Sequence, residues 1–483
     1  MNNTIVYSSE SDNCYLYDYQ HSLSMLIHPD IMKIHNNADN PDIDPYYKKK
    51  YYYLKENGFF SQKKASNFLT ELSGSIIKNN IIQAKQIVFE VTDSCNLRCT
   101  YCILGDCYEG FKSEKTKEIN QESAVKLLTH IINLKIQHDS PQLTISFYGG
   151  EPLLNMGFIK SIVEIIEGLN SGHKLNIVFS LTTNATLLYK NIQYLKDKDF
   201  KLMISLDGDS QNSSYRIFRK NSQGSFQEVI QNIDRIKENY PDFFLNNISF
   251  NAVLHKRNSV KDIYNFIYNR YHKIPNISEL SIDNISPQNE QFFKSIFKSK
   301  RESENEYEDS SSKLSEITHN QSTKFYELVD YIKYYSINSY VSDIPSLLNN
   351  TKKHFPTNTC IPFSKKIYLT TRNKILPCEK INHKFALGEV NNDINVNYDE
   401  IANSFNVVYK RLANLCQYCY VSRFCGVCMF NIKDLDFSNT YKFSCETFHD
   451  EKKMQYKLKN IFSFIERNPK DLYEVVENIT ITV

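Results

Sequence analysis

Apolar runs of the strand type alternate with helical patterns through the middle of the chain. This regular alternation predicts parallel strands that are joined by crossover helices, which is an α/β arrangement. The expected strands are Gln86–Val91, Leu143–Phe147, Leu175–Leu181, Lys201–Leu206, Ile248–Leu254 and Leu280–Ile285. The helical patterns between them include Gln121–Lys135, Phe158–Leu169 and Phe226–Tyr240.

The number of strand–helix units favours an incomplete barrel. Six units are too few for the eight of a full barrel, so a partial (β/α)6 barrel fits the count, with a doubly wound open sheet as the alternative. In both architectures ligands gather beyond the C-terminal ends of the strands. Polar residues at or after these ends are therefore candidates for binding, with strand-end or helix-capping roles as the alternative. They include Thr183, Asn184, Ser205, Asp207, Asn251, Asp283 and Asn284.

The segments on either side of the predicted barrel have other patterns. Thr4–Tyr7 and Cys14–Tyr17 flank polar turn residues, which predicts a hairpin, and a more helical stretch follows around Tyr46–Tyr51. Residues 291–320 are rich in charge and Ser, which predicts an exposed linker or mobile insert ahead of a helix at Lys324–Tyr335. The expected domains are 1–84 (small α+β recognition domain), 85–290 (barrel), 291–355 (linker), 356–450 (C-terminal cysteine-rich domain) and 451–483 (helical tail).

Composition and charge narrow the class of protein. A chain of 483 residues suggests roughly three domains of about 150 residues each. The net charge of +2 gives no overall attraction to nucleic acid or to an anionic membrane. No apolar stretch approaches the roughly 18 residues of a membrane helix, and the first residues lack a signal-peptide pattern. Twelve cysteines in such a chain favour metal ligands over disulfides and a cytoplasmic location.

Three cysteines stand close together directly after the first predicted strand. Cys95, Cys99 and Cys102 have a C-x3-C-x2-C spacing, which offers three thiolates on one tight loop. A [4Fe–4S] cluster held by three thiolates keeps one iron open for a ligand from solution. The alternative is structural zinc, which takes four Cys or His ligands, commonly as two separated pairs. Cys107 is near enough in the sequence to be the fourth zinc ligand.

The end of the second predicted strand carries another candidate. Leu143–Phe147 runs into Tyr148-Gly149-Gly150-Glu151-Pro152. Two glycines at a strand end let the backbone approach a ligand closely, and the carboxylate of Glu151 suits a ligand amine. Alone, this sequence is compatible with an ordinary turn. Because this turn follows one strand after the cysteine loop, it is a much more specific indication of a ligand site.

The cysteine loop and the Gly-Gly-Glu-Pro turn together resemble the radical S-adenosylmethionine (SAM) enzymes. In that family the open iron binds the amino and carboxylate groups of SAM, and reductive cleavage gives a 5′-deoxyadenosyl radical that abstracts a substrate hydrogen. The resemblance implies a partial barrel and cluster ligation by Cys95, Cys99 and Cys102. It assigns no catalytic acid or base. It implies SAM contacts at Tyr101, Gly149, Gly150, Glu151, Asn184, Ser205 and Arg216, with Arg219 as the alternative partner of the SAM carboxylate.

Seven further cysteines lie in the last quarter of the chain. The C-x2-C-x5-C-x2-C core from Cys416 to Cys428 is by itself typical of a zinc ribbon. After the triplet, the order resembles the SPASM domain, the auxiliary-cluster extension of radical SAM peptide-modifying enzymes. Asn373 stands where that family has Gly, and its backbone tolerance preserves the turn. The resemblance implies one auxiliary [4Fe–4S] cluster on Cys416, Cys419, Cys425 and Cys445, and another on Cys360, Cys378 and Cys428, whose fourth position is open or taken by a non-Cys ligand.

Two cysteines and the N-terminal segment remain. Cys14 and Cys107 belong to neither auxiliary set, and we expect both to be packing residues. A hairpin with a short helical part is weakly similar to peptide-recognition elements, which bind the leader of a ribosomally made precursor as an added strand. A structural cap on the barrel is the alternative.

These observations lead to three hypotheses. The first is a cytoplasmic radical SAM/SPASM peptide maturase that installs a thioether or carbon–carbon crosslink while auxiliary clusters accept the surplus electron. Its expected partners are a precursor peptide and an electron donor such as flavodoxin or ferredoxin, with no nucleic acid and no membrane. The second is an anaerobic sulfatase-maturating, formylglycine-forming enzyme. The third is a non-catalytic, zinc-containing protein that binds peptides.

Overall fold

The computed structural model divides the chain into two compact units. We call Leu72–Ser310 with Cys360–Ser404 the sheet unit, and Met1–Glu71 with Ser311–Thr359 and Phe405–Val483 the terminal unit. Each unit is described by itself. The residues that the structure describes are 2–37, 42–61, 68–109, 116–138, 140–172, 174–306, 323–336, 354–437 and 443–478.

A ten-stranded mixed sheet is the core of the sheet unit. Its first part has six parallel strands in chain order, and a seventh parallel strand, β10, pairs with β4 and leads into an antiparallel extension. From β4 to β9 each strand pairs with the next one along the chain, as in a partial barrel and unlike the doubly wound alternative, whose order reverses within the parallel strands. The strands are β4 (Gln86–Thr92), β5 (Gln142–Gly149), β6 (Asn176–Thr183), β7 (Lys201–Ser205), β8 (Ile248–Leu254), β9 (Asn276–Glu279), β10 (Lys366–Leu369), β11 (Lys374–Leu376), β12 (Gly388–Val390) and β13 (Ile394–Asn395).

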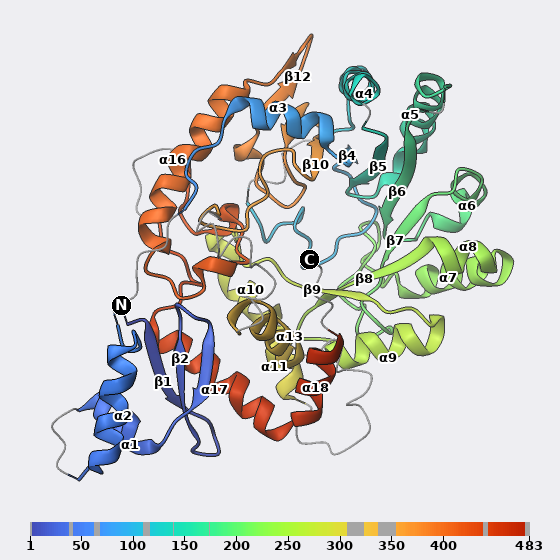
Figure 1. The fold of residues 1–483 in the computed structure, drawn as a ribbon. Coiled ribbons are helices and arrows are strands. Elements are labelled where there is room, and N and C mark those ends of the chain that lie inside the picture. Colours follow the sequence, from blue (N-terminus) through green and yellow to red (C-terminus); the bar gives the residue numbers. More distant parts are fainter. Residues whose placement is uncertain are drawn as a thin grey trace. The chain divides into compact units, whose positions relative to one another are not determined.

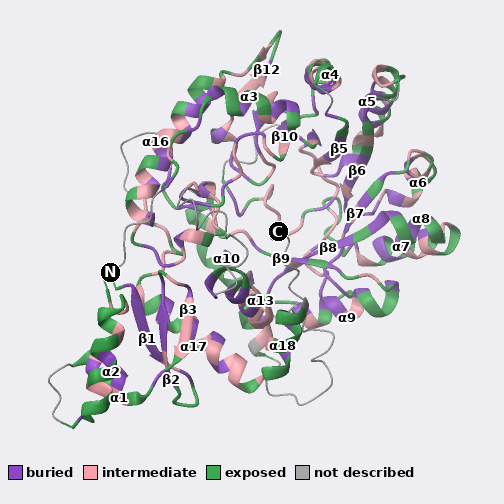
Figure 2. Ribbon diagram, viewed as in Figure 1, coloured by how far each residue is buried: buried purple, intermediate pink, exposed green. Residues whose placement is uncertain are grey.

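Helices cover the outer face of the parallel strands, as expected for a partial barrel (Figure 1). Aromatic side chains fill the sheet core, where Phe200 stacks between Phe147 and Phe179. In Figure 2 buried positions recur along the strands β4 to β8, whereas the helices around them carry many exposed positions. The helices are α3 (Gly74–Gln83), α4 (Gln121–Gln137), α5 (Met156–Leu169), α6 (Leu188–Asp197), α7 (Phe226–Asn239), α8 (Pro241–Asn247) and α9 (Val260–Tyr271).

The predicted α/β class and the six-unit count are confirmed, but the sixth strand was misplaced. The structure has β9 at Asn276–Glu279 rather than at Leu280–Ile285. This strand has a single strongly apolar residue, Ile277, so its own sequence carries a weak strand signal, and among the described residues it pairs only with β8. The apolar alternation continues past it, yet Ile282 is 53% exposed and belongs to no strand.

The predicted exposed linker is wrong for its described part. Residues 290–305 form α10 (Glu290–Ile296) and α11 (Lys300–Asn305) instead. Phe293 and Ile296 are buried in a cluster with Tyr101, because their spacing puts both on one face of α10. Residues 307–322 lie outside the described residues.

The terminal unit contains a small antiparallel sheet and several helices. The predicted N-terminal hairpin is confirmed as β1 paired with β2, and β3 adds a third strand at one edge. Cys14 is buried in a core cluster with Leu16 and Ile31, as expected for a packing residue. The elements are β1 (Thr4–Ser8), β2 (Cys14–Asp18), β3 (Leu23–Leu26), α1 (Pro29–Asn36), α2 (Pro45–Glu56), α13 (Thr323–Asp330), the π-turn Tyr331–Tyr335, α17 (Glu451–Arg467) and α18 (Pro469–Asn478), and α16 (Tyr398–Cys416) ends here after starting in the sheet unit.

A division by compactness does not test the five predicted domain boundaries, which stay predictions. The SPASM-like and recognition domains stay predictions for the same reason. Within the described ranges, every helix is too short or too polar to span a bilayer.

Candidate active site

The cysteine loop leaves the carboxyl end of β4 and is fixed by backbone hydrogen bonds. Arg98 N donates to Ile217 O (2.8 Å) and Thr100 N donates to Tyr215 O (3.1 Å), so a later segment frames the loop. Within the loop, Leu97 N donates to Cys95 Sγ (3.4 Å) and Cys102 N donates to Cys99 O (3.2 Å). The loop is thus folded tightly by its own sequence.

The three thiols of the loop fit a cluster. Burial raises the pKa of Cys95 to about 11 and that of Cys99 to about 12, and neighbouring thiols of the triplet add to both shifts. Among the described residues, no three His, Cys, Asp or Glu side chains converge as one metal ion requires. In a [4Fe–4S] cluster each thiolate binds a different iron, so the ligands need not converge on one point. The arrangement therefore suits a cluster better than a single zinc ion.

The Gly-Gly-Glu turn packs on the cysteine loop. Gly150 N donates to Thr92 O (2.7 Å), and Glu151 N donates to Ser94 O (2.9 Å). A Cβ atom on Gly150 would lie 2.0 Å from Ser94 O, and Gly149 has a φ of +126°. From the sequence we expect these glycines to admit a ligand. In the structure they admit the backbone of the loop that carries the cysteines.

Glu151 joins the ends of β5 and β6. Its buried carboxylate accepts hydrogen bonds from Thr183 Oγ1 (2.8 Å), Asn184 N (2.8 Å) and Leu153 N (3.1 Å). Burial raises the pKa of Glu151 to about 7, against the effect of these donors. A carboxylate has about four acceptor sites, so most of its capacity is used inside the protein. Its contact with a SAM amine stays a prediction.

Asn184 reaches the cysteine loop, whereas Ser205 does not. Asn184 Nδ2 donates to Asn96 Oδ1 (2.9 Å) and lies 3.6 Å from Cys95 Sγ. Ser205 is half-buried at the end of β7, where it pairs with Asn251 of β8. The structure therefore brings Gly149, Gly150, Glu151 and Asn184 to the loop and leaves Ser205 on a strand farther along the sheet.

Arg216 is paired with a buried carboxylate. Its Nε donates to Asp207 Oδ2 (2.9 Å), and the Tyr101 hydroxyl donates to the same oxygen. Nη1 of Arg216 faces Cys99 Sγ at 3.9 Å. Arg219, the alternative partner of the SAM carboxylate, donates instead from Nε to Cys95 O (3.2 Å).

His255 is a site residue that the sequence reasoning missed. Its ring lies 5.4 Å from the Tyr101 ring and 4.7 Å from the Tyr215 ring, between centroids. Nδ1 accepts a hydrogen bond from Arg257 N (3.2 Å), and Nε2 lies 3.2 Å from Asn258 Nδ2. Burial lowers the pKa of His255 to about 4, so the ring is neutral at pH 7. Its position directly after β8 was the signal that could have identified it.

The middle of the chain matches a known family model. Residues 89–267 match the model of the Radical SAM superfamily. This similarity covers less than half of the chain, and we call the matched region the radical SAM domain. A domain of this kind implies an enzyme with a [4Fe–4S] cluster and SAM, and it favours catalysis over the non-catalytic zinc hypothesis.

Two curated proteins are similar to part of this chain. The radical SAM cyclopropyl synthase TigE of Paramaledivibacter caminithermalis is 28% identical over 207 residues, which are 41% of each chain. A cysteine-type anaerobic sulfatase-maturating enzyme of Clostridium novyi is 29% identical over 152 residues, 30% of this chain and 38% of that enzyme. The chain thus spans less than half the length of these two curated relatives.

A solved structure shares the fold. It is described as native anSMEcpe with bound AdoMet and Cp18Cys peptide, and it aligns with a TM-score of 0.50 over 82% of this chain and 99% of that one. Its sequence identity of 16% makes this a likeness of fold alone.

Outside the radical SAM domain, four cysteines gather in the terminal unit. Burial and the nearby thiols of Cys419, Cys425 and Cys445 raise the pKa of Cys416 to about 12. Cys425 in turn has Cys419 and Cys445 as electrostatic neighbours. The set predicted for one auxiliary cluster is therefore close together.

The other auxiliary set stays a prediction. Cys360 and Cys378 belong to the sheet unit, and Cys428 belongs to the terminal unit. Asn373 has a φ of +59°, so the turn that was expected to tolerate Asn in place of Gly does adopt the left-handed backbone. Cys107 is buried beside Tyr101 and Tyr108, where its thiol donates to Thr100 O (3.5 Å).

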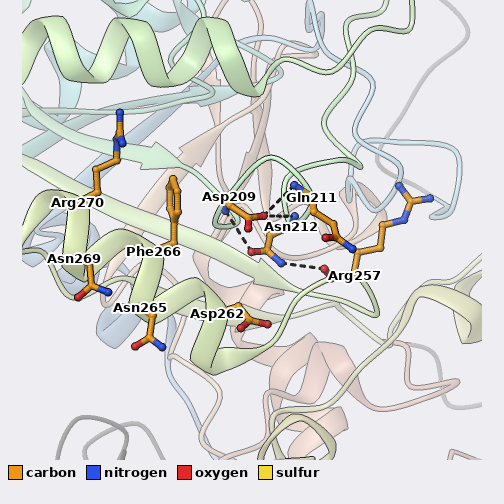
Figure 3. Close-up of a pocket in the computed structure, with 9 residues that line it drawn as sticks. All are labelled: Asp209, Gln211, Asn212, Arg257, Asp262, Asn265, Phe266, Asn269 and Arg270. Carbon is orange, nitrogen blue, oxygen red and sulfur yellow. Dashed lines mark hydrogen bonds between the residues drawn. The ribbon is translucent and has the colours of Figure 1, made fainter.

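A polar hollow of about 690 Å³ lies in the sheet unit (Figure 3). It contains none of the predicted cluster or SAM residues. The close-up shows the turn after β7 on one side and α9 on the other, with the Asn212 side chain bonded to the carbonyl of Arg257. The lining residues are Asp209, Gln211, Asn212, Arg257, Asp262, Asn265, Phe266, Asn269 and Arg270.

We expect Gly150→Ala to destabilise the protein by roughly 1–3 kcal/mol, because the new Cβ would overlap the Ser94 carbonyl and push the cysteine loop away. The variant should also bind less iron. Gly168→Ala is the matched control, since nothing lies within 4 Å of its added Cβ in α5. It should stabilise by about 0.5–1 kcal/mol. Urea unfolding measures the stability of both variants, and iron analysis measures their iron content. If the two variants are equally stable, the predicted overlap with Ser94 is wrong.

His255 should make the protein sensitive to acid. Between its ordinary pKa of 6.5 and its folded pKa of about 4, the unfolded chain binds a proton that the folded chain excludes. Stability is therefore lost as the pH falls through this window, by up to about 3 kcal/mol. His255→Gln should cost stability at pH 7, and the cost should shrink towards pH 4. Urea midpoints measured from pH 4 to 7 test this, and a cost that stays constant with pH refutes it.

Proposed function

We propose that this protein is a peptide-modifying radical SAM enzyme that installs a thioether or carbon–carbon crosslink in a ribosomally made precursor peptide. Cys95, Cys99 and Cys102 hold the cluster in this proposal. The bound cluster and SAM supply a 5′-deoxyadenosyl radical that removes one hydrogen atom from the peptide. Glu151 and Asn184 fix the loop at which this chemistry takes place, since each is bonded to it or to the turn beside it.

The observation that carries the proposal is a second group of close thiols in a chain that already has a radical SAM domain. Forming one crosslink removes two hydrogen atoms from the peptide. One becomes part of 5′-deoxyadenosine, and the other leaves as a proton and an electron. An auxiliary cluster on Cys416, Cys419, Cys425 and Cys445 would take that electron and pass it to a flavodoxin or ferredoxin type of carrier.

A precursor peptide is the proposed substrate, and the terminal unit supports this. Its three-stranded sheet ends at β3, and no further strand pairs with β3 among the described residues. Leu26 on this strand is 65% exposed. Such an edge can accept an extended peptide through main-chain hydrogen bonds. The solved structure of similar fold is described with a bound peptide, which agrees with a peptide substrate.

The second candidate is a sulfatase-maturating activity. It is favoured by the Clostridium novyi relative and by the likeness of fold. In this case the oxidised residue is a Cys or Ser of a sulfatase, and no crosslink forms. The two functions use the same cluster and SAM, so the substrate distinguishes them.

The test is an anaerobic reaction of the reconstituted full chain with SAM, a reductant and the short precursor peptide encoded beside its gene. We expect 5′-deoxyadenosine and a peptide that is lighter by two hydrogen atoms, seen by mass spectrometry. Cys99→Ala should form neither. Wild-type protein that carries the cluster but makes no 5′-deoxyadenosine would falsify the enzyme class. Conversion of a sulfatase peptide but not of the precursor would establish the second candidate.

The auxiliary cluster has its own test. Cys425→Ala should lower the iron content by about four per chain, because one ligand of a complete thiolate set is lost. Cys14→Ala, a buried cysteine outside the sets, should keep the wild-type iron content. SAM cleavage should continue in Cys425→Ala while crosslinked peptide is lost. Iron analysis with Mössbauer spectroscopy checks the first point, and zinc at these thiols in place of iron contradicts it.

A further inference from the structure

We propose that Arg216 raises the reduction potential of the cluster on the cysteine triplet, by holding a fixed cation and an N–H donor against the sulfur of Cys99. This inference rests on the ligand role proposed above for Cys95, Cys99 and Cys102. It assigns Arg216 a positioning and electrostatic role that differs from gripping the SAM carboxylate.

The contacts of Arg216 divide its guanidinium between two partners. Nη1 faces Cys99 Sγ at 3.9 Å, and Nε donates to Asp207 Oδ2 at 2.9 Å. Nε and Nη1 donate in different directions from one rigid plane. The carboxylate therefore binds one edge of the group while another edge faces the cysteine.

The position of Arg216 is fixed from several sides. Asp207 is fully buried and also accepts hydrogen bonds from the Tyr101 hydroxyl and from Val253 N (2.9 Å). The main chain of Arg216 is held as well, since its carbonyl accepts from both N and Oγ of Ser225 at 3.0 Å. Moving the side chain towards a ligand would leave Asp207 as a buried charge without its cation, which is costly.

A cation in this position favours the reduced cluster. Reduction adds negative charge to the cluster and its thiolates, and the potential depends on nearby charge and on hydrogen bonds to the sulfurs. Arg216 is 7% exposed, so water screens this interaction weakly. The cluster then accepts its electron from a weaker donor than it would otherwise need.

Arg219 is a natural control on the same loop. It is an exposed Arg, and its Nε donates to the main-chain carbonyl of Cys95 at 3.2 Å rather than to a sulfur. Arg216→Gln and Arg219→Gln therefore remove the same charge from the same loop. Only the first removes a buried donor that faces a thiolate.

The measurement is a redox titration of the anaerobically reconstituted full chain, followed by EPR, before SAM or peptide is added. The signal of the triplet cluster is identified by its absence in Cys99→Ala. In Arg216→Gln we expect the ratio of reduced to oxidised cluster at a fixed potential to fall at least tenfold, which is 59 mV for a one-electron couple. Arg216→Lys should restore part of the shift, and Arg219→Gln should shift the ratio less than threefold.

The outcomes separate this role from the alternatives. An unchanged potential in Arg216→Gln, with weaker SAM binding, overturns the proposal and makes Arg216 a SAM clamp. If Arg216→Gln does not take up the cluster, Arg216→Lys is titrated in its place, since it keeps a cation but loses the fixed guanidinium fork that faces Cys99. A shift of the same sign supports the proposal, and an unmoved potential overturns it. Wild-type protein without a reducible cluster on the triplet refutes the proposed function instead.

Discussion

Two hydrogen bonds beyond the ends of β4 and β5 set the geometry of the candidate active site. They run from the amides of Gly150 and Glu151 to the carbonyls of Thr92 and Ser94, and they extend the strand pairing into the loops. Because Gly150 has no side chain, the turn lies directly on the cysteine loop. The cysteines, the buried carboxylate of Glu151 and the end of β6 are then held in one block.

A second polar network approaches the same loop from the β7 side. Asp207 collects Arg216, Tyr101 and a main-chain amide, and every partner is buried or nearly so. Burying an ion pair seldom adds stability, because desolvation offsets the attraction. We therefore interpret the network as one that positions the cysteine loop rather than one that stabilises the fold. It ties Tyr101, the residue before Cys102, to the segment directly after β7 that carries Asp207.

Local sequence patterns predict most helices and strands and the cysteine triplet. The contacts among side chains of the site depend on long-range packing, which these patterns do not contain. Ile248–Leu254 was placed correctly because its apolar positions mark a strand buried in the sheet. The cysteine triplet is visible from spacing alone. The ion pair of Arg216 with Asp207 is not visible in the sequence, because no local pattern links these two residues. Tyr101, which donates to the same carboxylate, lies 106 positions before Asp207 in the chain. His255 carried only the signal of following a strand, which many residues without a function share.

The open edge of β3 has a consequence for the behaviour of the protein in solution. Among the described residues no strand pairs with its outer side, so its main-chain groups can pair with an extended chain, either a strand of a second copy or the leader proposed above. Self-association and leader binding would then compete for the same hydrogen-bonding groups. A concentrated sample without its peptide would be prone to aggregate, and the substrate would act as its solubilising agent.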